Sequence, residues 1–295
     1  MMSYYQAYQP IIDFFLLNLG FAYSQQVALR AGVFSVATAG FGALGAYASA
    51  ILVTRMGISP ALAIATATLV GTAVGFLLSV PLARLRGVFQ AIATLAFVEV
   101  IVSFLYYAEG ITGGAIGINN IPRMVSTPAL LAAVAAVMYV TWAIGRSGVG
   151  RAFDALRQDE TVAACLGVSI RNYHALAFVL SGAIGGLFGG LQSLYVFSIE
   201  PGQFGFGFMV AILTAIVLGG RGTLIGPVAG CAILALLPEI ARPLAENRPL
   251  VNGVILIAVI IYLPQGVGDG LLLQWRNRRS ARRARAIEEA SRAVP

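Results

Sequence analysis

Residue types that carry out enzyme chemistry are scarce in this chain. It has one histidine, His174, and two cysteines, Cys165 and Cys231. Zinc sites need about four clustered ligands, and a nucleophilic triad needs a histidine beside its nucleophile. His174 has no companion, and the cysteines fall one in a polar loop and one in an apolar run, so neither kind of site is expected. We interpret all three as packing or surface residues.

The basic residues narrow the function further, because all nineteen are arginine and the sequence has no lysine. A Walker A loop needs a lysine that contacts the phosphates, and Schiff-base chemistry needs a lysine amine. The chain is therefore not expected to bind ATP in that way itself. Its net charge of +7 comes largely from residues 275–295, where seven arginines favour a cytoplasmic position against anionic lipid rather than nucleic acid.

Composition places the chain in a membrane. Hydrophobic residues make up 59% and charged residues 11% of it, against about 25% charged in soluble proteins. Mean hydropathy is +0.86. Apolar runs near the length of a membrane helix predict an all-α polytopic protein with about nine (eight to ten) spans. We expect them at residues 10–29, 33–54, 60–83, 88–108, 128–144, 174–197, 207–218, 224–240 and 249–263.

Arginine positions predict the orientation. Residues 1–4 have neither a basic stretch nor a cleavage site, so the first span is expected to stay as an anchor. With nine spans and the tail inside, four arginines fall outside and fifteen inside. This bias agrees with the positive-inside rule and predicts a cytoplasmic C-terminus. We expect residues 1–274 to form the membrane domain and 275–295 an arginine-rich cytoplasmic tail.

The long polar interruption of the chain, residues 145–173, has the composition of a short soluble helix. Its charged residues are Arg151, Asp154, Arg157, Asp159 and Glu160. An apolar stripe at helical spacing is formed by Phe153, Leu156, Val162, Ala163 and Leu166. Gly167 follows where a helix would stop. Such a helix is too short and polar to span, and it is suited to docking onto something outside the membrane.

Three features inside the spans leave alternatives open. Glu99 lies near the middle of residues 88–108, where it either lines a path or pairs with a group such as the Ser103 hydroxyl. The glycines of residues 40–46 permit either close helix packing or a break at membrane depth. Residues 207–218 would extend only about 18 Å as a helix before Gly219 and Gly220. They read as half of a discontinuous helix or as part of a tilted one.

Four segments resemble the permease subunits of branched-chain amino-acid ABC transporters of the LivM type. AFDALRQDETVAACLGVSIRNYHALAFVLSGAIGGLFGG (152–190) is similar to the cytoplasmic coupling loop and following helix, the part that contacts the ATPase. The other three are FSVATAGFGALGAY (34–47), LRGVFQAIATLAFVEVI (85–101) and FGFGFMVAILTAIVLGGRGTLIGPVAG (204–230). They follow the family's order. Where the family has a glycine followed by a histidine or glutamine, this chain has Ala37 and Thr38. If this pair faces the translocation path, the substrate differs from a typical branched-chain amino acid.

The resemblance implies a type II ABC importer-like permease fold with discontinuous Gly-rich segments. It implies a coupling loop at residues 146–173, with ATPase contacts from Arg157, Asp159, Glu160, Ala163, Ala164 and Gly167. Combined with the features above, it suggests a translocation path formed by Thr38, Phe41, Gly45, Glu99, Gly219 and Gly220.

The resemblance also implies partners and a location. The expected partners are a second permease subunit in a heterodimer, two cytoplasmic ABC ATPases that bind ATP and Mg, an external solute-binding protein and membrane lipids. The chain itself would be a non-catalytic permease without cofactor or metal, in the bacterial inner membrane. It would import branched-chain or hydrophobic amino acids, or a related small polar solute.

Two other classes of function remain to be compared. An ion-coupled secondary transporter would share the broken helices and Glu99, but it would not need the amphipathic segment at 145–173. A membrane-embedded enzyme is disfavoured by the single histidine and the lack of paired carboxylates.

Overall fold

The computed structural model describes residues 2–240, with side chains for residues 9–236. The chain divides into two compact units, Met1–Thr214 and Ala215–Pro295. The predicted span at 249–263 and the predicted tail at 275–295 lie outside the described residues.

The described residues are helical, as the composition predicts. In chain order the helices are α1 (Met2–Arg30), α2 (Thr38–Met56), α3 (Pro60–Leu82), α4 (Val88–Tyr107), α5 (Glu109–Thr112), α6 (Thr127–Arg146), α7 (Gly148–Gln158), α8 (Glu160–Cys165), α9 (Ile170–Tyr195), α10 (Phe206–Gly219) and α11 (Ile225–Ile240), with 3-10 turns η1 (Gly114–Ile116) and η2 (Pro201–Phe204). Residues 2–240 form no strand, and one isolated antiparallel bridge joins Ile118 to Ile199.

Within the described part, five segments are long and apolar enough to cross a membrane. They are Pro60–Leu82, Val88–Tyr107, Thr127–Arg146, Ile170–Tyr195 and Pro201–Gly219. Their bounds agree closely with the predicted spans at 60–83, 88–108 and 128–144. The predicted total of nine spans stays a prediction.

The helix predicted from Val33 begins at Thr38 instead, because the preceding residues bond to side chains. The Gln25 side-chain amide donates to the Ser35 carbonyl, and the Val36 N–H donates to Thr94 Oγ1 at 3.1 Å. The Thr38 hydroxyl donates to Gln25 Oε1 at 2.8 Å. Buried backbone must be hydrogen-bonded, and polar side chains of α1 and α4 do this for an extended segment inside the protein.

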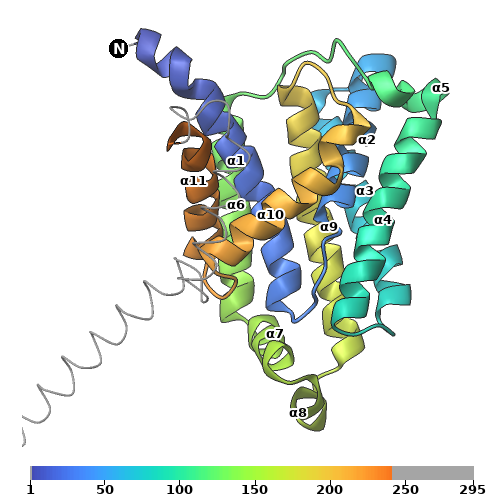
Figure 1. Ribbon diagram of the computed structural model, residues 1–295, viewed down its shortest axis with the longest axis vertical. Coiled ribbons are helices and arrows are strands. Elements are labelled where there is room, and N and C mark those ends of the chain that lie inside the picture. The colour runs from blue at the N-terminus through green and yellow to red at the C-terminus, as the bar shows by residue number, and fades with distance from the viewer. Residues whose placement is uncertain (1, 241–295) are drawn as a thin grey trace, which may run out of the picture. The chain divides into compact units, whose positions relative to one another are not determined.

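Helix α9 is the centre of the first unit and contacts α1, α2 and α3 (Figure 1). Its glycines let neighbouring backbones come close. A Cβ atom on Gly45 of α2 would lie 2.7 Å from Gly186 Cα, and one on Gly71 of α3 would lie 2.9 Å from the same atom. Of the two alternatives for residues 40–46, close packing is therefore what is found, since α2 is continuous.

The first unit has two distinct ends. One carries α7 and α8 (Figure 1); we call it the α7–α8 end. At or near it lie the arginines Arg30, Arg84, Arg86, Arg146, Arg151, Arg157 and Arg171. The opposite end carries Arg55 and Arg123. There Arg123 Nη2 lies 3.7 Å from the buried Asp13 carboxylate, and the Arg123 guanidinium lies over the Tyr195 ring.

The second unit contains a tight helical turn. Helix α10 ends at Gly219, close to the predicted end of the short apolar run, and α11 follows after five residues. Gly220 has φ +99°, and a Cβ atom on Gly219 would lie 2.9 Å from the Gly230 backbone nitrogen of α11. The glycines therefore make a close reversal at this point.

We expect Gly71→Ala to destabilise the protein. The new methyl group would meet the Gly182 carbonyl oxygen and Gly186 Cα of α9, which are backbone atoms that cannot rotate away. Overpacking of this kind typically costs about 1–3 kcal/mol, so the melting temperature in detergent should fall. Gly110→Ala is the control, because no atom lies within 4 Å of its added Cβ. Equal melting temperatures for the two variants would contradict the packing described.

Candidate functional site

Helix α7 starts the polar segment at the α7–α8 end. The Ser147 hydroxyl oxygen accepts the Val149 N–H at 3.2 Å and caps the helix. Phe153 and Leu156 are buried, and the Phe153 ring meets the Tyr173 ring of α9 edge-on, with centroids 6.3 Å apart. The apolar face of α7 is therefore packed against the membrane helices.

The single helix predicted for this segment is in fact two. Asp159 is extended at φ −159°, and its carboxylate accepts the N–H groups of Thr161 at 2.7 Å and Val162 at 3.1 Å. This cap starts α8 in a new direction. Val162 and Leu166 are consequently 56% and 75% exposed, so the predicted continuous apolar stripe is corrected: only its first half and Ala163 are buried.

The end of α8 agrees with the prediction at Gly167. The Val168 N–H donates to the Ala163 carbonyl and the Gly167 N–H to the Ala164 carbonyl, both at 3.0 Å. This is the Schellman arrangement, which needs a left-handed residue, and Gly167 has φ +83°. Glycine is thus required here by the backbone, in addition to any docking role.

Ion pairs connect α7 and α8 to different parts of the membrane bundle. Asp154 lies 3.4 Å from Arg30 at the end of α1, and 3.9 Å from Arg157. Glu160 of α8 lies 3.4 Å from Arg86, in the segment between α3 and α4. Two of the predicted ATPase contacts, Arg157 and Glu160, therefore also have partners within the chain.

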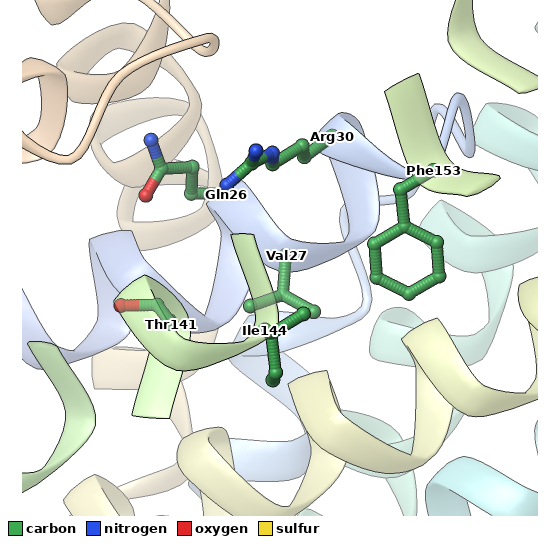
Figure 2. Close-up of a pocket in the computed structure, with 6 residues that line it drawn as sticks. All are labelled: Gln26, Val27, Arg30, Thr141, Ile144 and Phe153. Carbon is green, nitrogen blue, oxygen red and sulfur yellow. The ribbon is translucent and has the colours of Figure 1, made fainter. Parts of the chain in front are cut away.

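A tightly packed junction joins α7 to the bundle. Figure 2 shows the side chains that line a small cavity at this junction, from the ends of α1 and α6 and from α7. The cavity has a volume of about 10 Å³. These lining residues are Gln26, Val27, Arg30, Thr141, Ile144 and Phe153. Such a volume holds no more than about one water molecule. A displacement of α7 would therefore press directly on α1 and α6.

The outward side of the segment is open. A groove of about 500 Å³ is lined by Arg151, Asp154, Ala155, Gln158, Asp159, Val162, Ala163 and Leu166. Its walls combine charged groups with exposed apolar side chains and small alanines. This mixture is suited to receiving a protein surface rather than a small ligand.

The predicted path residues lie in three places. Thr38 joins a buried polar cluster in which the Ser24 hydroxyl lies 3.2 Å from the Thr38 hydroxyl and donates to the Ser181 carbonyl at 2.7 Å. Phe41 and Gly45 follow on the buried side of α2. The structure thus brings three of the six candidates together where α1, α2 and α9 meet.

The other three candidates are elsewhere. Glu99 is on the exposed side of α4. Gly219 and Gly220 belong to the second unit, at the α10–α11 reversal.

Comparison with known proteins decides the family. Residues 14–264 match the family described as the permease component of the branched-chain amino acid transport system. The chain belongs to this permease family.

Individual relatives agree with that assignment. The high-affinity branched-chain amino acid transport system permease proteins LivM of Escherichia coli K12 and Salmonella typhimurium LT2 are each 30% identical to this permease over 271 residues. The aligned region covers 80% of this chain and 64% of the relative, so the chain spans under two thirds of these proteins. LivH of Escherichia coli K12, named for the same system, is 31% identical over 45% of the chain and 43% of its own length. No solved structure gives a match.

The histidine and the two cysteines, which we interpret from the sequence as packing or surface residues, lie in different parts of this permease. His174 is buried inside α9, while Cys165 is exposed and Cys231 is buried. Among the described residues, no group of three or more His, Cys, Asp or Glu could hold a metal ion.

Sequence reasoning missed the bundle's own charged partners of the polar segment. Arg30 and Arg86 follow the predicted spans at 10–29 and 60–83, and the sequence assigned them no partner. Their spacing from Asp154 and Glu160 along the chain gives no signal of contact. Only the folded backbone brings these side chains together.

We expect the Asp159 cap to depend on pH. The pKa of its carboxyl lies below the ordinary value, chiefly because the Val162 N–H, and next the Thr161 N–H, bonds to it. Such a group stabilises the fold above its unfolded pKa, and the stabilisation is lost as pH falls through the folded pKa. Asp159→Ala should therefore speed amide hydrogen exchange at Thr161 and Val162 at neutral pH, and its difference from wild type should shrink in acid.

Asp159→Asn is the matched control, because its amide oxygen still accepts a hydrogen bond. It should keep most of the protection at neutral pH. Exchange rates in Asp159→Ala that equal those of wild type at neutral pH would show that the cap does not hold α8.

Proposed function

We propose that this chain is the transmembrane permease subunit of an ABC importer, in which α7 and α8 receive the motion of cytoplasmic ATPase subunits. One observation carries the proposal: an open, mixed-polarity groove lies on a two-helix segment whose inner side is packed and ion-paired to the bundle. A segment built in this way binds a protein on one side and passes its displacement inward on the other. Family membership supports the same function.

The ion pairs Asp154–Arg30 and Glu160–Arg86 would transmit a displacement of α7 and α8 to two different helices. Asp154 and Arg30 connect α7 to α1, which carries Ser24 and Gln25 of the buried polar cluster. Glu160 and Arg86 connect α8 to the segment that leads into α4. Rotation or translation of the segment would then shift α1 and α4 relative to the glycine-packed α2, α3 and α9. Such sliding of packed helices is a known way to alternate access.

The arginine distribution supports a cytoplasmic α7–α8 end. Seven arginines of the first unit lie at or near that end, and Arg55 and Arg123 lie at the other. Arginine is retained on the cytoplasmic side of membrane proteins. We infer that the protein is a multi-pass protein of the bacterial inner membrane, with the ATPases bound at this end. The predicted cytoplasmic C-terminus belongs to the same proposal.

The partners follow from the relatives. LivM and LivH carry the name of one transport system, which supports pairing of this chain with a second permease subunit. Two ABC ATPases would hold the ATP and Mg, and an external binding protein would deliver the solute. The chain would be non-catalytic, with no cofactor of its own. ATPase contacts are proposed for Arg157, Asp159, Glu160, Ala163, Ala164 and Gly167.

The solute is proposed to be a branched-chain or hydrophobic amino acid, or a related small polar molecule. The names of the relatives support the first class. The path would use Thr38, Phe41 and Gly45 beside the buried polar cluster, with Glu99, Gly219 and Gly220. Type II importer topology and about nine spans complete the proposed architecture.

An uptake experiment separates this function from ion-coupled transport. The permease is expressed with its ATPases and binding protein, and uptake of labelled leucine is measured in membrane vesicles. An importer driven by ATP keeps its uptake when an uncoupler collapses the ion gradient, and it loses uptake when ATP is withheld. Uptake that needs only the gradient would establish the secondary transporter.

We expect Glu160→Arg to abolish uptake while the protein remains inserted in the membrane. The substitution sets two guanidinium groups against each other at the Arg86 contact, so α8 loses its connection to α4. Adding Arg86→Glu restores opposite charges and should recover much of the uptake. ATP-dependent uptake is the readout, with membrane abundance measured by immunoblot.

Glu109→Arg is the control for charge reversal alone. Glu109 is exposed in α5, which follows α4 at the end of the unit opposite α7 and α8. It should leave uptake near wild type. Normal uptake and normal ATPase co-purification in Glu160→Arg would refute the coupling role. Failure of the double variant would mean that Glu160 acts on the ATPase directly.

A further inference from the structure

Helix α4 is packed against its own chain along one narrow seam. Its buried residues recur every three or four positions: Gln90, Thr94, Val98, Val102 and Leu105. Val98 and Val102 meet Val36 and Ala39 of the neighbouring segment in one hydrophobic cluster. Phe97 also packs partly against this cluster, with its ring 5.7 Å from the Phe41 ring. The opposite side of the helix, which carries Ile92, Glu99 and Ser103, is not covered by the described residues of its unit.

That uncovered surface carries a charge in mid-span. Glu99 is exposed and sits twelve residues into the twenty-residue helix Val88–Tyr107. No hydrogen bond or ion pair to Glu99 occurs among the described residues. Ser103, one turn further along, is exposed on the same side. A carboxylate in this position is costly in lipid and is normally turned towards protein or water.

The other exposed spans are different. Helix α3 presents Leu62, Leu69, Phe76 and Leu77, and α6 presents Leu131, Tyr139, Val140 and Trp142. Helix α3 has no charged residue, and α6 has only its final Arg146. Those two surfaces are suited to acyl chains, whereas the Glu99 surface is not.

We propose that the second permease subunit covers this surface of α4, with Glu99 accepting hydrogen bonds from a cationic or amide group of that subunit. This rests on the proposed function, because a second subunit is the partner that the LivM and LivH relatives supply. The apolar flanks Ile92, Val100 and Phe104, at 58%, 64% and 58% exposure, would be buried with it. A buried carboxylate among apolar contacts fixes the register of two helices.

The position of this surface gives it a role in coupling. Helix α4 begins two residues after Arg86, the partner of Glu160. Motion of α8 therefore reaches the interface through one continuous helix. The two permease subunits would be moved against each other along the Glu99 contact.

Photocrosslinking in the assembled transporter tests the proposal. A benzophenone amino acid is placed at Ala96 or Ser103, on either side of Glu99, so that the carboxylate is kept. Leu69 of α3, which is 66% exposed, gives the background. Irradiated membranes are expected to yield an adduct between this chain and the second permease from Ala96 or Ser103, at least several-fold above the Leu69 background.

Two outcomes would overturn the proposal. Crosslinks from both positions only to residues 241–295 of the same chain would identify an internal partner. Labelling of lipid alone, in a transporter that still takes up leucine, would show that the surface faces the bilayer. In either case the importer function still stands if uptake is retained and the ATPases co-purify. The importer function itself would be refuted if the ATPases failed to bind the complex that carries no benzophenone amino acid.

A substitution gives a second readout. Glu99→Ala is expected to lower the amount of second permease that co-purifies with the tagged chain by about tenfold or more, because a buried donor is left unpaired. Phe76→Ala, on the exposed face of α3, should leave it unchanged. Equal recovery of the second permease from both variants would contradict the interface.

Discussion

Direct contact between helix backbones at glycine is the constraint on which the rest of the structure depends. Gly45 and Gly71 both place their backbones against Gly186 of α9, so three helices meet without intervening side chains. In a membrane such contacts provide the packing that the hydrophobic effect cannot. They also leave no interlocking side chains where these three helices meet.

Polar side chains inside the bundle lie beside the extended residues that precede α2, where the backbone is not helical. The extended residues before α2 would be an unpaired stretch within the protein, and Gln25 and Thr94 bond to them. These two side chains come from α1 and α4, the helices that ion pairs connect to α7 and α8. The same two helices therefore hold the extended residues before α2 and lead to the ion pairs with the polar segment. This gives the polar segment a physical connection to the buried polar cluster around Thr38.

In the polar segment, local contacts set the ends of the helices and tertiary contacts attach the helices to the bundle. Ser147, Asp159 and Gly167 define its helix ends by capping and by a left-handed turn, all of which act over a few residues. The charged residues between them were predicted to point to a partner. Asp154 and Glu160 also pair with arginines of the bundle, and Asp154 lines the open groove as well. The same two helices thus carry both the residues packed on the bundle and the residues that line the groove.

Local pattern in the sequence determined the membrane class, the bounds of α3, α4 and α6, and the end of α8 at Gly167. Hydropathy and capping depend on neighbours along the chain, so a sequence shows them directly. The division of the polar segment at Asp159 is also local, although the spacing of the apolar residues did not reveal it. Only the tertiary structure decided that α2 begins at Thr38, that its glycines pack closely against α9, and that Arg30 and Arg86 pair with Asp154 and Glu160. It also decided that Glu99 faces away from its own bundle. Each of these depends on which distant backbones come within a few ångströms, and residue type and spacing carry no record of that distance.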